Sequence, residues 1–553
     1  MNTSVWRPLR KPLFRAFWLA ALVSNIGTWM HDVGAAWLMT SLTTSPLMVA
    51  LMQTAVYLPF FLMALPSGAM ADVFDKRKLL LFGQLWMLVS ALALAGLSFC
   101  GAISPWILLL LTFALGLGAA VSAPAWNAVT PELVARPQLQ GAIALSGVSF
   151  NLSRGVGSVI GGIIVALFGS PTVFLLNAVS FVGLVLFFLG WRRKPKESFR
   201  HAERVTEAMR AGIRYVRHAP ELTSVLMRSA LFSVSSSAFW ALLPLVCRQK
   251  LGFSAYQYGL ALGLFGLGTL LGAFFLPKLR ARFSLDYCVA IGTASMSFSI
   301  IGLVWAQNFV LAGPFMIFAG TSFLLVNSCL NLAVQVAVPV WVRARALAFF
   351  ILVCQGSVAL GSILWGSIAS QTGLVTPLLL CSLTLLMGLI AIRRHPLVAV
   401  EQLDVSLSRH WDQPRLAIEP EPTHGPVLVT VEYIVDPDRV LDFAEAMELV
   451  RMQRLRDGAF QWHLFHDLSR PGRHIETYFV ESWAEHMRQH ERVTVADKMI
   501  EERALSFHKG ELPPAVNHYL SAYASRRIEE PDEDPNRAAS PVREGDYRFL
   551  LRM

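Results

Sequence analysis

Two side chains of opposite charge lie inside long apolar stretches of the sequence. Asp32 lies within residues 14–40, and Arg154 lies within residues 139–168. If these stretches cross a membrane, each charge costs about 3 kcal/mol on insertion scales, so it usually faces a cavity and has a function there. We interpret Asp32 as a group that binds and releases a proton, and Arg154 as a residue that tunes Asp32 or holds an anionic substrate. Substrate and proton are then expected to compete for the site.

Each charge shares a helix face with other polar or aromatic side chains. Helical spacing groups Asn25, Trp29 and Asp32 on one face, and Asn151, Arg154 and Ser158 on another. We expect both faces to line one central cavity, in which the two charges partly neutralise each other. The alternative is a static ion pair that only fixes helix packing.

His31 is the one histidine within the apolar stretches, and it adjoins Asp32. On a helical wheel the two side chains point about 100° apart. We interpret His31 as a histidine at the membrane interface, and a proton relay is the alternative.

The segments that hold these charges are long enough to be membrane helices. A helix that crosses about 30 Å of hydrocarbon needs about 20 mostly apolar residues. Twelve such stretches occur, at residues 14–40, 46–71, 79–100, 105–128, 139–168, 171–191, 223–247, 255–277, 285–306, 309–335, 345–369 and 374–392. Residues 1–394 contain 28 of the 47 Lys and Arg residues but only 9 of the 37 Asp and Glu residues, which excludes a soluble enzyme for this part.

Lys and Arg cluster in alternate connections between these stretches. With the N-terminus in the cytoplasm, nearly all of the basic loop residues face the cytoplasm, and only Arg248 and Lys250 face outward. Short loops rich in Lys and Arg stay on the cytoplasmic side of a membrane. We therefore expect a multi-pass protein of the inner membrane with both termini in the cytoplasm. Because this placement accounts for most of the positive charge, nucleic-acid binding is not expected.

The sequence repeats itself with an offset of 204 residues. Gly68 and Gly272 are separated by this offset, as are Gly169 and Gly373, and a string at residues 157–162 returns in similar form at residues 361–366. One offset shared by several helix pairs indicates two six-helix halves of the same topology. The predicted fold class of this part is an all-α membrane bundle built from two parallel six-helix repeats.

The connection after the second stretch carries a motif that includes Gly68, Asp72, Arg77 and Lys78. It resembles the loop motif G-x-x-x-D-R-x-G-R-[RK] of the major facilitator superfamily, although a Val and an Asp replace the first Arg and the second Gly. The resemblance implies a twelve-helix transporter that works by alternating access, in which this motif gates by tying cytoplasmic helix ends together in one state. The second half has Leu276 where the motif has its Asp.

The fifth stretch contains Gly157, Ser158, Gly161 and Gly162. They resemble the G-P-x-x-G-G signature of drug:proton antiporters in this superfamily, with Ser in place of Pro. Close helix packing through small residues is the alternative. In the fourth stretch, Thr112 occupies the position of an Arg that proton-coupled members carry.

Three further short sequence motifs indicate which branch of the superfamily this chain resembles. They are SNIGTW at residues 24–29, APAW at residues 123–126 and SFNLSR at residues 149–154. They resemble the transmembrane secretion effector branch, which includes enterobactin exporters and macrolide-type efflux pumps. This resemblance covers roughly residues 10–394 and implies export from the cytoplasm, with siderophores, drugs and lysolipids all open as the cargo.

Beyond residue 394 the chain becomes acidic and more polar. The expected order is strand, helix, two strands, two helices and strand, at residues 427–435, 438–456, 460–466, 475–482, 484–491, 494–506 and 516–522. This order predicts a cytosolic α+β ferredoxin-like domain. The predicted segments are a cytosolic tail (1–12), an N-terminal six-helix half (13–191), a cytosolic linker with an amphipathic helix (192–222), a C-terminal six-helix half (223–394), a proline-rich linker (395–425), the ferredoxin-like domain (426–523) and a disordered tail (524–553).

The polar domain resembles the antibiotic-biosynthesis monooxygenase-like domains, including the stretch from Trp483 to His490. Some haem-degrading members use an Asn on the first strand, where this chain has Glu432 and Tyr433. We therefore expect a non-catalytic module for dimerisation or regulation rather than an enzyme. No cofactor or metal is expected, because no Cys-x-x-Cys motif occurs and all six cysteines lie outside this domain.

The sequence thus predicts a secondary transporter that exports a small amphipathic molecule, such as a siderophore or drug, in exchange for protons. The alternative is a transporter fused to a monooxygenase-like domain that modifies its cargo. A pump powered by nucleotide hydrolysis is excluded because no Gly-Lys dipeptide occurs, so there is no P-loop. The expected partners are the small-molecule substrate, protons, the lipid bilayer and, through the C-terminal domain, a second copy of the chain.

Overall fold

The structure is a computed structural model that describes residues 6–191, 205–392, 397 and 404–521, apart from residues 409, 412, 413, 415, 417 and 419. The side chains of residues 65, 69, 71–73, 205–211, 391 and 392 are not described. The chain divides into two compact units, Met1–Val405 and Ser406–Met553. The predicted disordered tail (524–553) lies outside the described residues.

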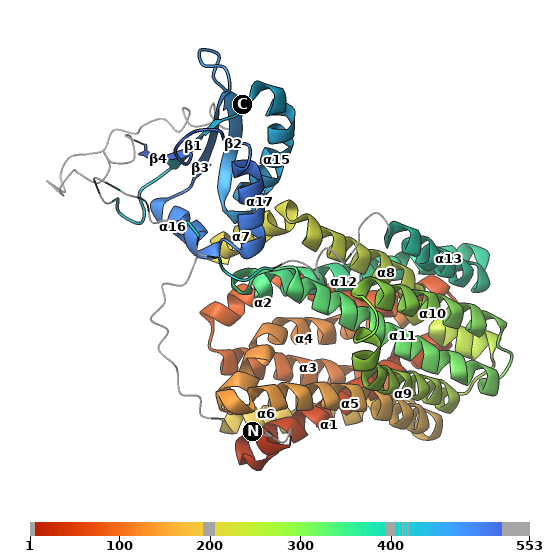
Figure 1. Ribbon diagram of the computed structural model, residues 1–553. Helices are drawn as coiled ribbons and strands as arrows, with labels where there is room; N and C mark the ends of the chain where they lie inside the picture. Colours follow the sequence, from red (N-terminus) through yellow and green to blue (C-terminus); the bar gives the residue numbers. More distant parts are fainter. Residues whose placement is uncertain are drawn as a thin grey trace, which may run out of the picture. The chain divides into compact units, whose positions relative to one another are not determined.

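The first unit consists of helices that run side by side (Figure 1). In chain order the long ones are α1 (Pro12–Leu42), α2 (Pro46–Val73), α3 (Lys76–Phe99), α4 (Pro105–Leu133), α5 (Leu139–Phe168), α6 (Ser170–Gly190), α8 (Pro220–Leu245), α9 (Ala255–Arg280), α10 (Leu285–Trp305), α11 (Phe309–Val336), α12 (Val340–Thr372) and α13 (Val375–Ile392). Ten of the described helices are long and apolar enough to cross a membrane, by length and composition. Of the other two, α1 carries His31 and Asp32, and α13 has a shorter apolar part.

Local sequence sets where many of these helices begin and end. Ser104, Ser254 and Asn308 lie just before helices, and each side chain accepts a hydrogen bond from a backbone N–H of the first turn. Gly169 and Gly373 follow α5 and α12, one repeat apart, with φ angles of 81° and 80°. Because glycine adopts this backbone region most readily, the two halves make the same turn with the same residue.

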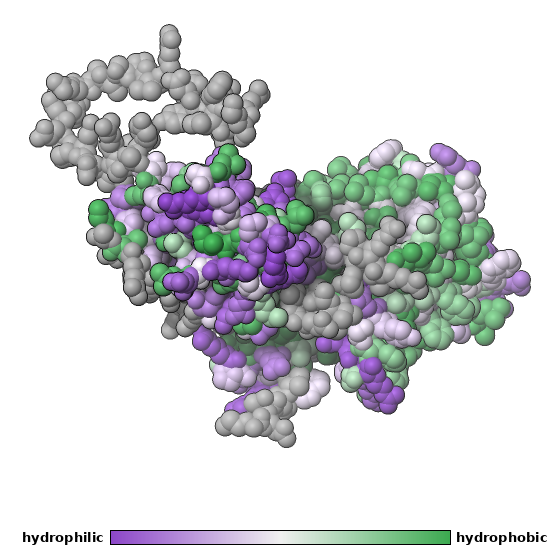
Figure 2. Space-filling view, turned by 45° about the horizontal axis from the view of Figure 1, so that its top comes forward, coloured by the Kyte–Doolittle hydropathy of each residue, from purple (hydrophilic) through white to green (hydrophobic). Residues whose placement is uncertain are grey.

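Two helix pairs make most of the contacts between the predicted halves, and most other contacts fall within a half. Helix α5 packs against α9, and α2 packs against α12. In the second pair, Thr54 Oγ1 donates to the carbonyl of Ala359 at 3.0 Å, and Leu47 N donates to Ser370 Oγ at 3.2 Å. Hydrophobic residues cover much of the visible surface of this unit (Figure 2).

Helix α7 (Val205–His218) is the amphipathic helix predicted in the connection between the halves. Part of this helix packs against α12. The rings of Tyr215 and Trp341 meet edge to face at 5.7 Å, and Gly212 lies beside Phe349. Tyr215 is buried, whereas Ile213 stays 49% exposed.

The second unit is a four-stranded antiparallel sheet with helices on one face. The strands β1 (Val427–Ile434), β2 (Ala459–His466), β3 (Arg473–Val480) and β4 (Ala515–Leu520) pair in the order β2-β3-β1-β4. The helices are α15 (Val440–Asp457), α16 (Trp483–Arg492) and α17 (Val495–Leu505). Burial alternates along β1 and β3, so one sheet face packs on the helices and the other stays partly exposed.

Residues before the sheet also belong to the second unit. This unit begins at Ser406, inside the stretch predicted as a linker (395–425). Val495 N donates to the carbonyl of Ser406 at 2.9 Å, and Ser408 N donates to that of Val493 at 3.0 Å. Backbone pairing thus gives this segment a fixed place that its proline and charge content does not reveal.

Candidate functional site

Helices of both halves enclose a cavity in the first unit. Its volume is about 70 Å³, and its walls come from α1, α2, α4, α5, α8 and α9. The polar or aromatic side chains in its lining are Trp29, Asp32, Gln53, Tyr57, Thr112, Arg154, Trp240 and Tyr258. Three of the six residues on the two helix faces predicted to line the cavity, Trp29, Asp32 and Arg154, are therefore brought together.

Asp32 lies three residues after Trp29 on α1, so both side chains reach the cavity from one helix face. The side chain is partly buried. Among the described residues, none hydrogen-bonds to its carboxylate or forms an ion pair with it. A carboxylate in this position can accept hydrogen bonds from a ligand when ionised, and can donate one when protonated.

Arg154 lies on α5 and is 9% exposed. Its guanidinium carbon lies over four aromatic rings. The distances to the ring centroids are 5.0 Å for Trp29, 4.8 Å for Trp240, 4.6 Å for Phe265 and 5.3 Å for Phe323. Ring faces stabilise a cation, but they do not accept the in-plane N–H bonds of a guanidinium. No described residue accepts a hydrogen bond from Arg154, and no described carboxylate lies within 4.0 Å of it.

Asp32 and Arg154 therefore share a cavity without forming a direct ion pair. A static pair that only fixes helix packing would require a contact that is absent among the described residues. The N–H groups of the guanidinium have no acceptor in the described part of the chain, and the carboxylate faces the same space. The arrangement can receive a ligand that carries both an anionic group and hydrogen-bond donors.

The other polar residues predicted on these helix faces lie elsewhere. Asn25, Asn151 and Ser158 are not in the cavity lining, and Asn151 Nδ2 donates to the carbonyl of Gly147 at 3.0 Å. His31 is only 3% exposed and its ring lies 4.9 Å from that of Phe174. The interfacial prediction for His31 is wrong because its side of α1 packs against α6 inside the protein.

Four further polar or aromatic residues of the lining are not indicated by the sequence analysis. Gln53 and Tyr57 lie one turn apart on α2, so a polar pair at i and i+4 within an apolar stretch is the signal that could have found them. Trp240 and Tyr258 carry no such signal, because aromatic residues are common in membrane helices.

The small residues of α5 lie at contacts with two other helices. An added Cβ on Gly157 or Gly161 would lie 2.8 Å from backbone atoms of α1. One on Gly162 would lie 2.8 Å from the Cα of Gly259 on α9, and the carbonyl of Ser158 faces the same glycine. Side chains do not fit at these distances, so the close approach depends on glycine. Gly162 thus lies at the contact between the two halves.

The predicted gating motif lies between α2 and α3. Arg77 donates two hydrogen bonds, 2.6 and 2.7 Å long, to backbone carbonyls in the last turn of α6. Asp75 caps α3 by accepting a hydrogen bond from Lys78 N at 3.1 Å. A cation at the last carbonyls stabilises a helix end. A Cβ added to Gly68 would have no other atom within 4 Å. The side chain of Asp72 is not among those that the structure describes.

Side chains of both halves stack at one end of the cavity. Trp37 on α1 stacks on Tyr258 of α9, with ring centroids 5.6 Å apart. Arg248, just beyond α8, lies over Trp37 at 5.4 Å and donates to Thr40 Oγ1 at 3.0 Å. Because Tyr258 also lines the cavity, this stack lies next to the cavity, toward the bundle end where α1 ends and α9 begins.

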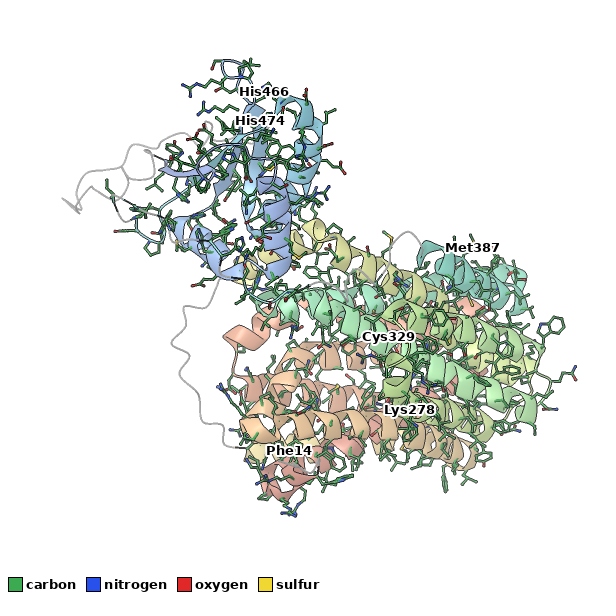
Figure 3. All side chains as sticks on the ribbon, in the orientation of Figure 1. Phe14, Lys278, Cys329, Met387, His466 and His474 are labelled. Carbon is green, nitrogen blue, oxygen red and sulfur yellow. The ribbon has the colours of Figure 1, made fainter. Side chains whose placement is uncertain are left out.

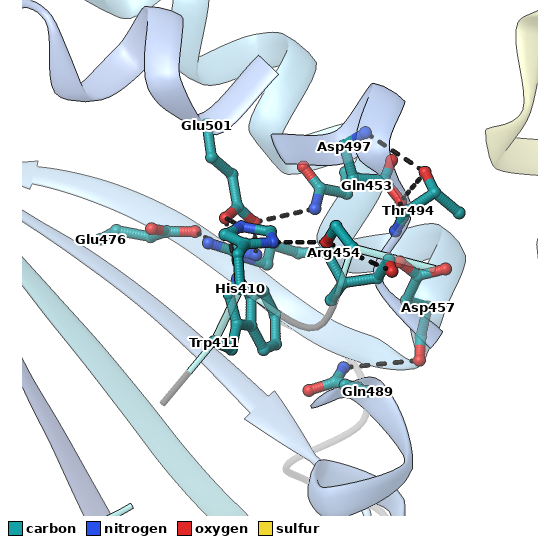
Figure 4. Close-up of polar contacts among 12 residues, drawn as sticks. His410, Trp411, Gln453, Arg454, Asp457, Glu476, Gln489, Thr494, Asp497 and Glu501 are labelled. Atoms are coloured by element: carbon teal, nitrogen blue, oxygen red, sulfur yellow. Dashed lines mark hydrogen bonds and ion pairs between the residues drawn. The ribbon is translucent and has the colours of Figure 1, made fainter. Parts of the chain in front are cut away.

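A second buried arginine lies in the second unit, between the sheet and its helices (Figure 4). Arg454 is 7% exposed and donates to Glu476 at 3.2 Å and to Glu501 at 2.5 Å. Glu501 is also hydrogen-bonded to His410 and Trp411, both at 2.8 Å. Burial alone would raise the pKa of Glu501, but the charge of Arg454 and these hydrogen bonds outweigh burial and lower it to about 2. This cluster is therefore a satisfied structural network.

Three histidines pack together near this network. His486 Nε2 and His490 Nε2 lie 3.4 Å apart, and the ring of His518 lies 4.8 Å from that of His486. Burial, together with His518 and His490, lowers the pKa of His486 to about 3, and burial with His518 lowers that of His490 to about 4. In the described part of the chain, no group of three or more His, Cys, Asp or Glu side chains could hold a metal ion.

The family model described as transmembrane secretion effector matches residues 3–527. The match includes the described part of the second unit as well as the helical unit, whereas the motifs in the sequence carry the resemblance only to about residue 394.

Curated relatives are transporters. The chain is 26% identical over 412 residues to the uncharacterized MFS-type transporter YfiS of Bacillus subtilis, which covers 69% of this chain and 95% of the relative. It is 22% identical over 361 residues to the staphyloferrin A transporter of Staphylococcus aureus, and the match covers 65% of this chain and 90% of that relative. It is 26% identical over 305 residues to the enterobactin exporter EntS of Escherichia coli, and the match covers 53% of this chain and 70% of that relative.

Solved transporter structures share the fold. The nucleoside transporter NupG superimposes with a TM-score of 0.54 at 14% identity, covering 71% of this chain and 99% of NupG. A bacterial homologue of the iron transporter ferroportin, in an inward-facing state, superimposes with a TM-score of 0.53 at 17% identity. The match covers 69% of this chain and 98% of the homologue. With the helical bundle, the family match and these relatives, the chain belongs to the transmembrane secretion effector family of major facilitator transporters.

Proposed function

We propose that this protein exports a small amphipathic molecule with an anionic group, of the siderophore or drug type, in exchange for protons. The observation that carries the proposal is the presence of Asp32 and Arg154, without a direct ion pair, in one cavity between the two halves. The relatives include a staphyloferrin A transporter and an enterobactin exporter, which supports a siderophore-type cargo.

Arg154 supports the anionic group on the cargo. A buried guanidinium needs an anion or neutral acceptors to offset its desolvation, and the described residues around it offer aromatic faces instead. A carboxylate or catecholate can accept two parallel N–H bonds from one guanidinium. The rings of Trp29 and Trp240 would then contact the apolar part of the same molecule.

Asp32 supports coupling to protons. When ionised, its carboxylate can accept hydrogen bonds from hydroxyl or amine groups of the cargo. A proton that reaches Asp32 from outside removes this acceptor, so the cargo is bound less tightly and leaves. Cargo and proton then compete for the site, which is the requirement for exchange in opposite directions.

We further propose twelve membrane spans with both termini in the cytoplasm. The ten helices with clear span character are joined by α1, whose Asp32 faces the cavity rather than lipid, and by α13. The concentration of Lys and Arg in alternate connections supports this orientation. In it, the stack of Trp37, Tyr258 and Arg248 lies at the outer end of the cavity.

Alternating access by rocking of the two six-helix halves follows from this arrangement. The halves meet through α5 with α9 and α2 with α12, on both sides of the cavity. Opening the outer end requires separation of Arg248 from Thr40 and of Trp37 from Tyr258.

Transport by an Asp32→Asn variant tests the proposal. Cells with and without the protein are compared for accumulation of catecholate and citrate-type siderophores and macrolides, with and without an uncoupler. We expect the wild type to lower accumulation of at least one compound in an uncoupler-sensitive way, and the variant to lose that sensitivity. Glu221→Gln, at the start of α8 and outside the cavity lining, is the matched control. Full pH-dependent export by Asp32→Asn would refute proton coupling through this residue.

For the second unit we propose a ferredoxin-like module that pairs with a second copy of the chain. Its strand order is that of the βαββαβ fold, and the exposed sheet face carries a row of uncharged side chains that includes Phe460, Phe479 and Leu428. An uncharged row can meet its own copy without like-charge repulsion. The mass of the purified full chain in detergent should be that of a dimer, and Phe460→Glu should shift it to a monomer; an unchanged monomeric mass in both would refute pairing.

A further inference from the structure

A second cavity of about 460 Å³ lies at the end of α9, away from Asp32 and Arg154. We call it the basic cavity. Its lining includes the apolar side chains Phe275, Leu276, Leu279 and Phe283 and the cations Lys278 and Arg282. Figure 3 shows Lys278 at this end of α9. Residues of α11 complete the wall, and the volume is in the range of small-ligand pockets.

The two cations of the basic cavity have no protein counterion among the described residues. Lys278 Nζ lies 5.1 Å from the ring centroid of Phe274. In the part of the chain that the structure describes, neither the side chain of Lys278 nor that of Arg282 has a hydrogen bond or ion pair, and the lining contains no carboxylate. An anion supplied from outside the protein would therefore meet two uncompensated positive charges beside an apolar wall.

Three other cations at helix ends of the first unit are paired with the protein. Lys76 lies 3.7 Å from Glu132 across α3 and α4, and Arg77 bonds to carbonyls of α6. Arg228 forms an ion pair with Asp286 at 2.5 Å. Basic residues of this unit can thus find partners within the protein, whereas the two cations of the basic cavity have none among the described residues.

The internal repeat shows how the basic cavity differs from its counterpart in the first half. With the offset of 204 residues, Asp72 and Asp75 correspond to Leu276 and Leu279, while Lys78 corresponds to Arg282. Asp75 caps a helix in the first half, whereas both leucines line the basic cavity in the second. The second half keeps positive charge at this place and replaces the carboxylates with an apolar surface.

The exposed side of α9 beside the basic cavity is suited to hydrocarbon. Phe274 is 66% exposed and Phe275 is 52% exposed. In the proposed orientation this end of α9 lies at the cytoplasmic boundary of the bilayer. Anionic lipid headgroups concentrate there, and basic pockets between membrane helices bind them.

We propose that the basic cavity binds one anionic phospholipid of the inner leaflet. Its phosphate would lie between Lys278 and Arg282, and the beginning of an acyl chain would lie along Phe275, Leu276 and Leu279. This site is separate from the cargo cavity, so it does not depend on the identity of the cargo or on proton coupling.

Native mass spectrometry of the full chain tests this proposal. The protein is reconstituted in vesicles of phosphatidylethanolamine and phosphatidylglycerol and then released into mild detergent. We expect the wild type to retain one phosphatidylglycerol in preference to phosphatidylethanolamine. The double variant Lys278→Gln/Arg282→Gln should bind phosphatidylglycerol about 30-fold more weakly, because each cation near an anionic headgroup increases affinity about fivefold.

Arg280→Gln provides the matched control, because Arg280 lies between the two cations but does not line the basic cavity. It should retain phosphatidylglycerol like the wild type. Both lining cations are exposed, so the double variant is expected to fold, and an unchanged thermal unfolding temperature checks this. Equal retention by the double variant and the wild type, an equal loss in Arg280→Gln, or equal retention of phosphatidylethanolamine would overturn the proposal. The Asp32→Asn variant should retain the lipid, so failure of the transport proposal is recognised separately.

Discussion

Two arginines of this protein are almost equally buried, and their surroundings differ in one respect. Arg154 in the helical unit and Arg454 in the α+β unit are 9% and 7% exposed, and both lie over aromatic rings. Arg454 also donates to Glu476 and Glu501. Arg154 has no acceptor among the described residues and faces a cavity instead.

The difference separates a structural charge from one that is available to a ligand. Removal of one partner from a satisfied buried pair leaves an uncompensated charge and costs stability. Removal of a buried charge that has no protein partner leaves no other group unpaired. Arg154 should therefore control binding of a ligand, and Arg454 should control folding of the second unit.

Replacement of Arg154 should have the largest effect of all on function. For Arg154→Gln we expect export of an anionic cargo to fall about 100-fold, since loss of one partner of a buried charge pair costs roughly 2–5 kcal/mol. Arg154→Lys should restore little, because it keeps the charge and loses the paired N–H fork. Cargo accumulation measures the effect, and the unfolding temperature should not fall. If Arg154→Gln also lowered the unfolding temperature, Arg154 would be a structural residue like Arg454.

Replacement of Arg454 should instead destabilise the second unit. We expect Arg454→Met to cost about 3–5 kcal/mol, because Glu476 and Glu501 stay buried without their cation. Hydrogen exchange of residues 427–520 in the full chain measures this cost. The triple variant with Glu476→Gln and Glu501→Gln should recover most of it; equal instability of both variants would mean that packing, not charge, is responsible.

Acid should destabilise the second unit in two steps. Burial lowers the pKa of His486 to about 3 and that of His490 to about 4, below the ordinary value of 6.5, so the unfolded state takes up protons first as the pH falls. We expect a loss of roughly 2 kcal/mol from His486 by pH 5. A second loss should begin below about pH 4.5, where Glu501 is protonated more readily in the unfolded state. Unfolding followed against pH measures both steps, and His486→Gln should remove much of the first.

The smallest effect is expected at Arg77. Its bonds to carbonyls of α6 are partly exposed, so Arg77→Gln should cost about 1 kcal/mol of stability. Export should stay within about twofold of the wild type. A loss of export as large as that of Arg154→Gln, without a change in unfolding temperature, would show that this residue acts in gating rather than in helix capping.

Periodic patterns predict much of the fold. A helix forms in each of the twelve apolar stretches, and the strands and helices of the second unit follow the predicted order within a few residues. The 204-residue offset predicts the matching turns at Gly169 and Gly373. Rare charges in apolar stretches point to Asp32 and Arg154, because a charge that faced hydrocarbon instead of a cavity would be costly to insert.

Features that depend on how helices are placed against each other are not predictable in this way. Asn25 and Asn151 each lie about one turn before a lining residue and share its helix face, but they are not part of the lining. A helical wheel gives the direction of His31, but not that α6 covers it. His410 and Trp411, which hydrogen-bond to Glu501, come from a proline-rich segment whose pairing depends on a distant helix.

The glycine contact between α5 and α9 has a mechanical consequence. Where Gly162 meets Gly259, backbone packs directly on backbone, so no side chain has to change its packing at this contact if the tilt between the halves changes. A single methyl group at either position would not fit and would force the two helices apart.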